Sequence, residues 1–202
     1  PMVVPPTAAP WQDMPPMTDK PSLRRHFRDK RRAYCDAMRP ADRVRAFSVP
    51  PSVMTPLLSE QPVVAGYCAI GGEADPVRLL EAARARNCPI ALPWFADREA
   101  PMLFRQWKGG EPLHEAPFGG GQPAADSPEL TPSVLILPLV AFDRSGTRLG
   151  QGGGHYDRAL EGLPDAVTIG LAWSAQEAAE LPRERWDIPL THILTEREWI
   201  TP

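Results

Sequence analysis

The chain has 202 residues, of which 22 are basic and 25 acidic, so its formal net charge is −3. This length suits one sizeable hydrophobic core, and the near balance of charges argues against broad electrostatic binding to nucleic acid or to an anionic membrane. Apolar residues make up 43% and charged residues 23%, which is ordinary for a globular protein and excludes wholesale disorder.

The N-terminal segment is set apart by proline, which occupies six of the first sixteen positions. We expect residues 1–19 to form a flexible tail and residues 20–202 to form a single domain. A secretory signal would begin with basic residues, but the tail has no lysine or arginine. The longest apolar run, 134–142, has nine residues, whereas a membrane helix needs about 17 to 25. We therefore expect a cytoplasmic protein that acts as a monomer, without a membrane or nucleic-acid partner. The three cysteines are widely spaced, which suits neither a disulfide framework nor a paired-cysteine zinc site.

A basic amphipathic helix is predicted from about Lys20 to Met38, because Thr18 or Asp19 can cap it and Pro21 falls in its first turn. Apolar residues recur on one face of this helix, namely Leu23, Phe27, Tyr34 and Met38. Basic residues cover the remainder, namely Arg24, Arg25, Arg28, Lys30, Arg31 and Arg32. Prolines divide the following segment, 40–60, into two short helical pieces.

Strand and helix patterns alternate over the rest of the chain. They predict a strand at 62–70, a helix at 77–87, a strand at 89–95, a hairpin of 102–107 with 113–115, a strand at 133–142, a short helix from 155, and strands at 166–173 and 191–195. Residues 119–132 are rich in glycine and proline and predict an irregular loop. This alternation predicts an α/β fold, a three-layer sandwich with a mostly parallel central sheet.

The segment most suggestive of chemistry runs from Asp143 to Arg158, where a strand leads into a cluster of glycines and then into a helix. Amide protons freed by glycine at the carboxyl end of a parallel strand are a common way to hold phosphate. The glycines fit neither the P-loop motif nor the dinucleotide-binding motif. From composition alone, a mobile loop without a ligand therefore remains an alternative to a phosphate site. The sequence motifs of α/β-hydrolases, zinc proteases and zinc ribbons are absent.

Each candidate polar residue also has a plain structural alternative. Asp157 suits the first turn of any helix, and Asp187 suits an Asx turn. Lys20 and Arg24, four residues apart, form either a phosphate clamp or a solvated basic face. Glu73, just beyond a predicted strand, either contacts a ligand or caps the next helix.

Several ordered motifs across residues 20–199 resemble the 5-formyltetrahydrofolate cyclo-ligase family, whose members are also called methenyltetrahydrofolate synthetases. The most specific is Leu137-Pro-Leu-Val-Ala-Phe-Asp143, followed by Gly146 and by Arg148-Leu-Gly-Gln-Gly-Gly-Gly-His-Tyr-Asp-Arg158. Supporting matches are Lys20-Pro-Ser-Leu-Arg24, Glu73-Ala-Asp75, Met102-x-Phe104 with Trp107, Gly170-Leu-Ala-Trp173 with Gln176, and Asp187 with Thr195-Glu196.

The resemblance implies a fold similar to sugar-phosphate isomerase-like folds and an ATP- and Mg²⁺-dependent ligase. The substrate would be the small molecule 5-formyltetrahydrofolate, which is closed to 5,10-methenyltetrahydrofolate with release of ADP and phosphate. The γ-phosphoryl group would move onto the formyl oxygen, and N10 of the folate would then attack the activated carbon. Such chemistry asks the protein for positioning and charge stabilisation.

The resemblance also assigns roles to individual residues. ATP would be bound by Lys20 and Arg24 on the first helix and by Arg148, Leu149, Gly150, Gln151, Gly152, Gly153, Gly154, His155 and Tyr156. The folate would contact Cys68, Glu73, Met102 and Trp107 together with Gln151, Gly152, Gly153, Gly154 and His155, and Phe104 would share the apolar wall. Mg²⁺ would be held by Asp157 and Asp187, whose oxygens suit a hard cation. Arg148, His155 and Tyr156 would be the catalytic residues.

Among the positions that depart from the family pattern, two leave other functions open. His155 stands where tyrosine is usual, and Gln122 stands where the family has a carboxylate. These departures favour, as an alternative, a non-catalytic protein that binds nucleotide or folate on the same fold. The basic first helix favours a second alternative, an RNA-binding protein.

Overall fold

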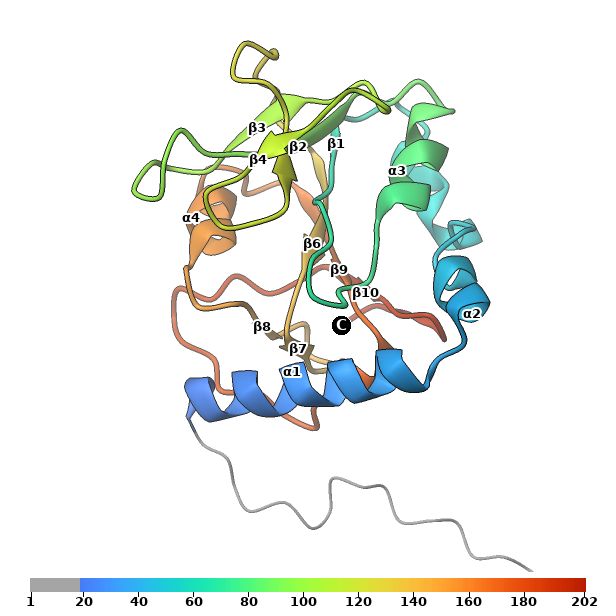
Figure 1. Ribbon diagram of the computed structural model, residues 1–202, viewed down its shortest axis with the longest axis vertical. Helices are drawn as coiled ribbons and strands as arrows, with labels where there is room; N and C mark the ends of the chain where they lie inside the picture. The colour runs from blue at the N-terminus through green and yellow to red at the C-terminus, as the bar shows by residue number, and fades with distance from the viewer. Residues whose placement is uncertain (1–18) are drawn as a thin grey trace, which may run out of the picture.

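The structure, a computed structural model, describes residues 19–202, so the predicted tail at 1–19 lies outside the described residues except for Asp19. A seven-stranded sheet forms the centre, in the order β11-β10-β9-β6-β1-β2-β3 (Figure 1). Its strands are β1 (Val64–Ala65), β2 (Ile90–Trp94), β3 (Leu103–Gln106), β6 (Val134–Pro138), β9 (Val167–Leu171), β10 (His192–Leu194) and β11 (Trp199–Ile200). Strands β10 to β2 run parallel, and the edge strands β3 and β11 are antiparallel to their neighbours.

Both faces of this sheet are buried. In β6, Ile136 faces a core shared with α3 (Val77–Arg84), whereas the next residue, Leu137, faces a core shared with α4 (His155–Glu161). Helices on both faces of a mostly parallel sheet confirm the predicted three-layer α/β sandwich. The similarity to sugar-phosphate isomerase-like folds stays a prediction.

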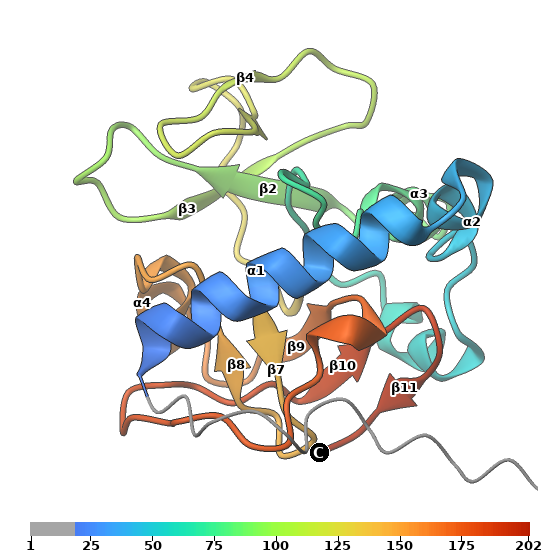
Figure 2. The ribbon, with the colours of Figure 1, turned by 60° about the horizontal axis from the view of Figure 1, so that its bottom comes forward.

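The first helix, α1 (Lys20–Ala37), lies across the end of the sheet toward which the parallel strands run (Figure 2). Asp19 caps it, as predicted, by accepting a hydrogen bond from the amide of Ser22 at 2.9 Å. Leu23 and Phe27 pack against the hairpin that follows β6. The remaining elements are α2 (Pro40–Arg45), β4 (His114–Glu115), β5 (Gly121–Gln122), β7 (Ala141–Phe142), β8 (Arg148–Leu149) and 3-10 turns at Ser52–Met54, Pro56–Leu58 and Ser174–Gln176.

Two predicted strand arrangements were wrong. Strand β3 pairs with β2 rather than with residues 113–115, and β4 pairs with β5 in a small separate sheet. The predicted strand at 133–142 is broken after Pro138, because the buried side-chain amide of Gln176 donates to the carbonyl oxygens of Leu139 and Val140 in place of a neighbouring strand. The chain then turns into the β7–β8 hairpin, which leads to the glycines.

Within residues 19–202, no helix is long and apolar enough to cross a membrane. Cys35, Cys68 and Cys88 are all free thiols.

Candidate active site

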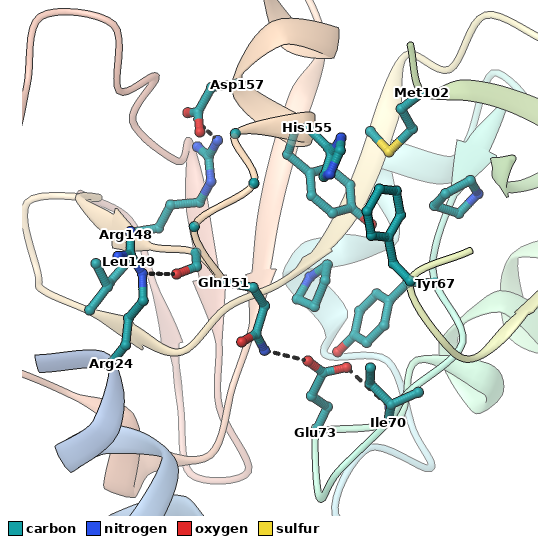
Figure 3. A pocket seen from close by; sticks show the side chains of 18 of the residues that line it. Arg24, Tyr67, Ile70, Glu73, Met102, Arg148, Leu149, Gln151, His155 and Asp157 are labelled. Carbon is teal, nitrogen blue, oxygen red and sulfur yellow. Dashed lines mark hydrogen bonds and ion pairs between the residues drawn. The ribbon is translucent and has the colours of Figure 1, made fainter. Parts of the chain in front are cut away.

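One cavity of about 970 Å³ opens at the carboxyl ends of the parallel strands, and most of the predicted site residues line it (Figure 3). Its walls are α1, residues 150–154 (the glycine loop), the start of α4, the loop that follows β1, and residues 184–187. This is the edge at which α/β sheets bind ligands. Segments that lie far apart in the sequence therefore meet around one space.

Helix α1 contributes a row of cations at helical spacing: Lys20, Arg24, Arg28 and Arg31 all line the cavity. Arg24 donates through Nε to the carbonyl oxygen of Gly150 at 2.9 Å, and Arg28 donates through Nη2 to Oε1 of Gln151 at 2.6 Å. The helix is thus tied to the glycine loop by side chains. Lys20 and Arg24 are partly buried at the cavity, so the alternative of a wholly solvated face is wrong for these two residues, whereas Arg25 and Arg32 are exposed.

The glycine loop needs glycine at two of its positions. Gly152 has φ 111° and Gly154 has φ 64°, values that side chains with a Cβ rarely adopt. In the described part of the chain, the backbone amides of residues 151–154 donate to no other residue's oxygen. These N–H groups therefore have no partner among the described residues and belong to a loop that lines the cavity, which suits an anion-binding backbone.

The two predicted metal ligands lie on the same side of the cavity, each with a cation beside it. Oδ1 of Asp157 lies 2.5 Å from Nη2 of Arg148, whose side chain is 5% exposed. Oδ2 of Asp187 lies 2.7 Å from Nζ of Lys20 and also accepts the amide of Glu184 at 2.8 Å. Burial acts to raise the pKa of Asp187, but the hydrogen bonds from Lys20 and Glu184 lower it below its ordinary value.

These two carboxylates suit Mg²⁺, which binds through one or two protein carboxylates together with phosphate oxygens and water. Among residues 19–202 no cluster of three acidic, histidine or cysteine side chains could hold a metal by itself. A cation at Asp157 and Asp187 would therefore depend on oxygen atoms from a ligand, and it would take the place now held by Arg148 and Lys20.

Glu73 faces the cavity from the loop after β1 and is 8% exposed. Its Oε2 accepts the amide of Ile70 at 3.1 Å, and its Oε1 accepts the side-chain amide of Gln151 at 3.2 Å (Figure 3). Burial raises the pKa of Glu73, and the positive charge of Arg31 opposes that shift. The proposed capping role is not observed, since the amide of Val77 at the start of α3 donates to Asp75 instead.

Aromatic rings form one end of the cavity. The ring of His155 lies 4.5 Å from that of Phe118 and 5.1 Å from that of Phe95, measured between centroids. Burial lowers the pKa of His155, and nearby Arg158 adds to the effect, so the imidazole is neutral at pH 7. Burial also raises the pKa of Tyr156 far above its ordinary value, which keeps this phenol protonated. Met102 and Cys68 line the same cavity.

Trp107 does not line this cavity, so its assignment to the folate site is corrected. Strand β3 runs antiparallel to β2, with Leu103 opposite Trp94 and Gln106 opposite Ala91. The chain therefore leaves the cavity at Met102 and carries Trp107 to the opposite end of β2, where its amide donates to Ile90. Phe104, expected in the same wall, is buried in the core instead.

Some lining residues were not predicted from the sequence. Arg28 and Arg31 continue the spacing of Lys20 and Arg24, so helical periodicity could have identified them. Phe95 and Phe118 carried no such signal, since long-range packing brings them to His155.

The unusual Gln122 has a structural explanation. Its side chain is buried, and Oε1 accepts the amide of Phe95 at 3.0 Å while Nε2 donates to the carbonyl oxygen of Phe95 at 3.3 Å. An amide makes both bonds, whereas an ionised carboxylate can only accept. Gln122 therefore positions the Phe95 backbone, and its uncharged side chain does not argue against catalysis.

Comparisons with known proteins agree with this geometry. Residues 16–196 match the model of the 5-formyltetrahydrofolate cyclo-ligase family. The 5-formyltetrahydrofolate cyclo-ligase of Haemophilus influenzae is 33% identical over 138 residues, covering 65% of this chain and 74% of that protein. The enzyme of the same name from Escherichia coli K12 is 34% identical over 161 residues, covering 75% of this chain and 84% of that protein.

A solved structure is also similar. The NMR structure of Aquifex aeolicus 5,10-methenyltetrahydrofolate synthetase superposes with a TM-score of 0.72 at 28% identity, covering 90% of this chain and 92% of that one. Given the family match and relatives that are identical to it at a third of the aligned positions, the chain belongs to the 5-formyltetrahydrofolate cyclo-ligase family.

Proposed function

We propose that the protein closes 5-formyltetrahydrofolate to 5,10-methenyltetrahydrofolate at the expense of ATP, releasing ADP and phosphate. The observation that carries this proposal is the single cavity in which the basic residues of α1, the glycine loop, two carboxylates and Glu73 converge. A phosphate-binding backbone next to a buried carboxylate suits a reaction between a nucleotide and a heterocycle. Family membership supports the same reaction.

The formyl oxygen is a poor leaving group, so the reaction begins with its phosphorylation. Transfer of the γ-phosphoryl group makes a bond between phosphorus and the formyl oxygen and releases ADP. N10 then attacks the formyl carbon, loses its proton, and expels phosphate with the former formyl oxygen. The protein contributes mainly by aligning the reactants and stabilising the charge on the transferring group.

ATP is proposed to bind on the α1 side of the cavity. Lys20 and Arg24 would contact its phosphates, and residues 148–156 would surround them with backbone amides. Asp157 and Asp187 would hold Mg²⁺, which neutralises phosphate charge when bound. Once a phosphate enters, Lys20 and Arg148 can leave their carboxylate partners for phosphate oxygens, because Arg and Lys bind both kinds of anion.

The folate is proposed to bind between Glu73 and the aromatic end of the cavity. Glu73 accepts N–H groups of the pterin, and Met102 and Cys68 supply apolar contact. Residues 151–155 lie between the nucleotide and folate positions and would contact both.

Three residues are proposed to act on the reacting atoms. The buried guanidinium of Arg148 stabilises charge on the transferring phosphoryl group. His155, neutral at pH 7, and Tyr156, a protonated phenol, donate hydrogen bonds without adding charge at the formyl group. A histidine performs this donor role as well as the tyrosine usual in the family.

Turnover of the purified protein tests this function. The protein is mixed with 5-formyltetrahydrofolate, ATP and Mg²⁺, and the absorbance of the methenyl product is followed with and without a chelator. We expect product only when ATP and the divalent ion are both present. Binding of ATP or folate without turnover would favour the non-catalytic alternative.

We also propose that the protein works as a monomer in the cytoplasm without nucleic acid. The formal net charge of −3 supports the absence of a nucleic-acid partner. The position of Lys20, Arg24, Arg28 and Arg31 supports it too, because these basic side chains of α1 line the cavity. Light scattering tests the monomer, and RNA binding at low salt tests the absence of a nucleic-acid partner.

A further inference from the structure

Arg31 is unusual among the charged residues of the cavity because it is buried yet incompletely bonded. Its side chain is 7% exposed. Nη2 donates to the carbonyl oxygen of Gly71 at 3.1 Å, whereas Nε and Nη1 have no hydrogen-bond partner within the described residues. Leaving such donors unpaired away from water is costly, so a buried arginine of this kind calls for a functional explanation.

The carboxylate of Glu73 is the anion next to these donors. Nη1 of Arg31 lies 3.7 Å from Oε1 of Glu73, within ion-pair range but too long for a hydrogen bond. Oε1 is instead hydrogen-bonded to Gln151, at 3.2 Å, from the glycine loop (Figure 3). Arg31 and Gln151 therefore share one oxygen of Glu73.

The surroundings of Glu73 make the charge of Arg31 important. Burial raises the pKa of Glu73, and Arg31 counters this. Tyr67 and Tyr156 also lie nearby, and burial raises the pKa of both phenols, so neither carries charge at neutral pH. The hydroxyl of Tyr67 donates to the carbonyl oxygen of Ala74. The next residue, Asp75, is not bonded to Glu73, and its Oδ1 accepts the amide of Val77 instead.

We propose that Arg31 is a positioning residue for folate binding, whose guanidinium holds the Glu73 carboxylate as an anion in place for the pterin ring. This inference rests on the proposed function, in which Glu73 contacts the folate. A pterin edge offers an amino group and a ring N–H, two donors that an ionised carboxylate accepts together. When the substrate displaces Gln151, Arg31 supplies the remaining partner of Oε1.

Kinetics of Arg31→Met test this role, with Arg32→Met as the matched control on the exposed side of the same helix. We expect Arg31→Met to raise the KM for 5-formyltetrahydrofolate roughly 10- to 100-fold, the effect of losing one charge-assisted hydrogen bond between the pterin and Glu73. The KM for ATP should change by less than about threefold, because Arg31 acts on the folate side. Arg31→Lys should recover most of the loss, and Arg32→Met should behave as wild type.

The variant Glu73→Gln separates positioning from general structural support. If Arg31 acts through Glu73, adding Arg31→Met to Glu73→Gln should raise the folate KM by less than about threefold further. An undiminished effect in that background, equal rises in both KM values, or a wild-type folate KM in Arg31→Met would overturn the inference. Arg31→Gln replaces Arg31→Met, with the same expectations, if the latter does not fold. A wild-type protein that forms no product would refute the proposed function and this inference with it.

Discussion

Asp157 accepts a hydrogen bond from the backbone amide of Ile188, at 3.4 Å, which joins the start of α4 to the loop that carries Asp187. Two carboxylates thirty positions apart in the sequence are thereby kept in one wall of the cavity. Each is neutralised by a basic side chain, Arg148 or Lys20. Basic side chains of this chain therefore balance the charge of the acidic wall, and both ion pairs are available for exchange.

Asp157→Asn should abolish most turnover while the protein stays folded. The amide can still accept the hydrogen bond of Arg148, but it lacks the charge that a divalent cation requires. We expect turnover to fall by at least about 100-fold, the cost of losing one strong electrostatic contact in an active site. Circular dichroism should show an unchanged fold, and wild-type turnover would contradict the metal assignment.

The Lys20–Asp187 ion pair should stabilise the folded protein at intermediate pH and lose this effect in acid and in alkali. The pKa of Asp187 is lowered from 3.8 in the folded protein. Its contribution to the free energy of unfolding is therefore complete above about pH 4 and is lost as the pH falls through this lowered pKa. The pKa of Lys20 is raised from 10.5, so its contribution is complete below that value and is lost as the pH rises above it.

Lys20→Met measures this contribution. Between about pH 5 and 10 the variant should unfold more easily than wild type by roughly 1 kcal/mol, the size of a partly exposed charge-assisted bond. The difference should shrink below about pH 4 as Asp187 becomes protonated. Urea unfolding of both proteins across this pH range measures the difference in their free energies of unfolding. A difference that grows in acid would contradict the stabilising role of the pair.

Met102 and Trp107 should affect folate binding differently, although the sequence pattern groups them together. Met102 lines the cavity, whereas Trp107 lies at the other end of β2. Met102→Ala should raise the folate KM about 3- to 10-fold through lost apolar contact. Trp107→Phe should leave it unchanged, and a comparable rise in both variants would restore Trp107 to the site.

Gln122→Glu, which restores the residue type usual in the family, should destabilise this protein. An ionised carboxylate cannot donate to the carbonyl oxygen of Phe95 and would be buried. We expect a loss of about 1 to 3 kcal/mol in the free energy of unfolding at pH 7, smaller in acid where the carboxyl is protonated. Gln61→Glu, at an exposed position, is the control. Equal stability of both variants would contradict the role given to Gln122.

The sequence predicted the layers of this fold because hydrophobic periodicity records which faces are buried. It missed the break after Pro138, since nothing local reveals that Gln176, distant in sequence, takes the hydrogen bonds of Leu139 and Val140. The two-residue strands β4, β5, β7 and β8 are likewise set by their partners and too short to show a period.

The site was predictable where neighbouring positions in sequence are also neighbours in space. Residues 148–157 form one continuous wall, and Lys20 and Arg24 share a helix face. Trp107 was misplaced because the resemblance grouped it with Met102, whereas the antiparallel strand β3 carries it to the other end of β2. The links from Gln151 to Arg28 and Glu73 join three separate segments and became visible only in the structure.

The fate of the formyl oxygen shows whether the γ-phosphoryl group is transferred to it. Wild-type protein is supplied with 5-formyltetrahydrofolate labelled with ¹⁸O in the formyl group, together with ATP and Mg²⁺, and the released phosphate is analysed by mass spectrometry. If the γ-phosphoryl group moves onto that oxygen, each phosphate carries one ¹⁸O atom for each methenyl product formed. Unlabelled phosphate accompanying the methenyl product would contradict the account.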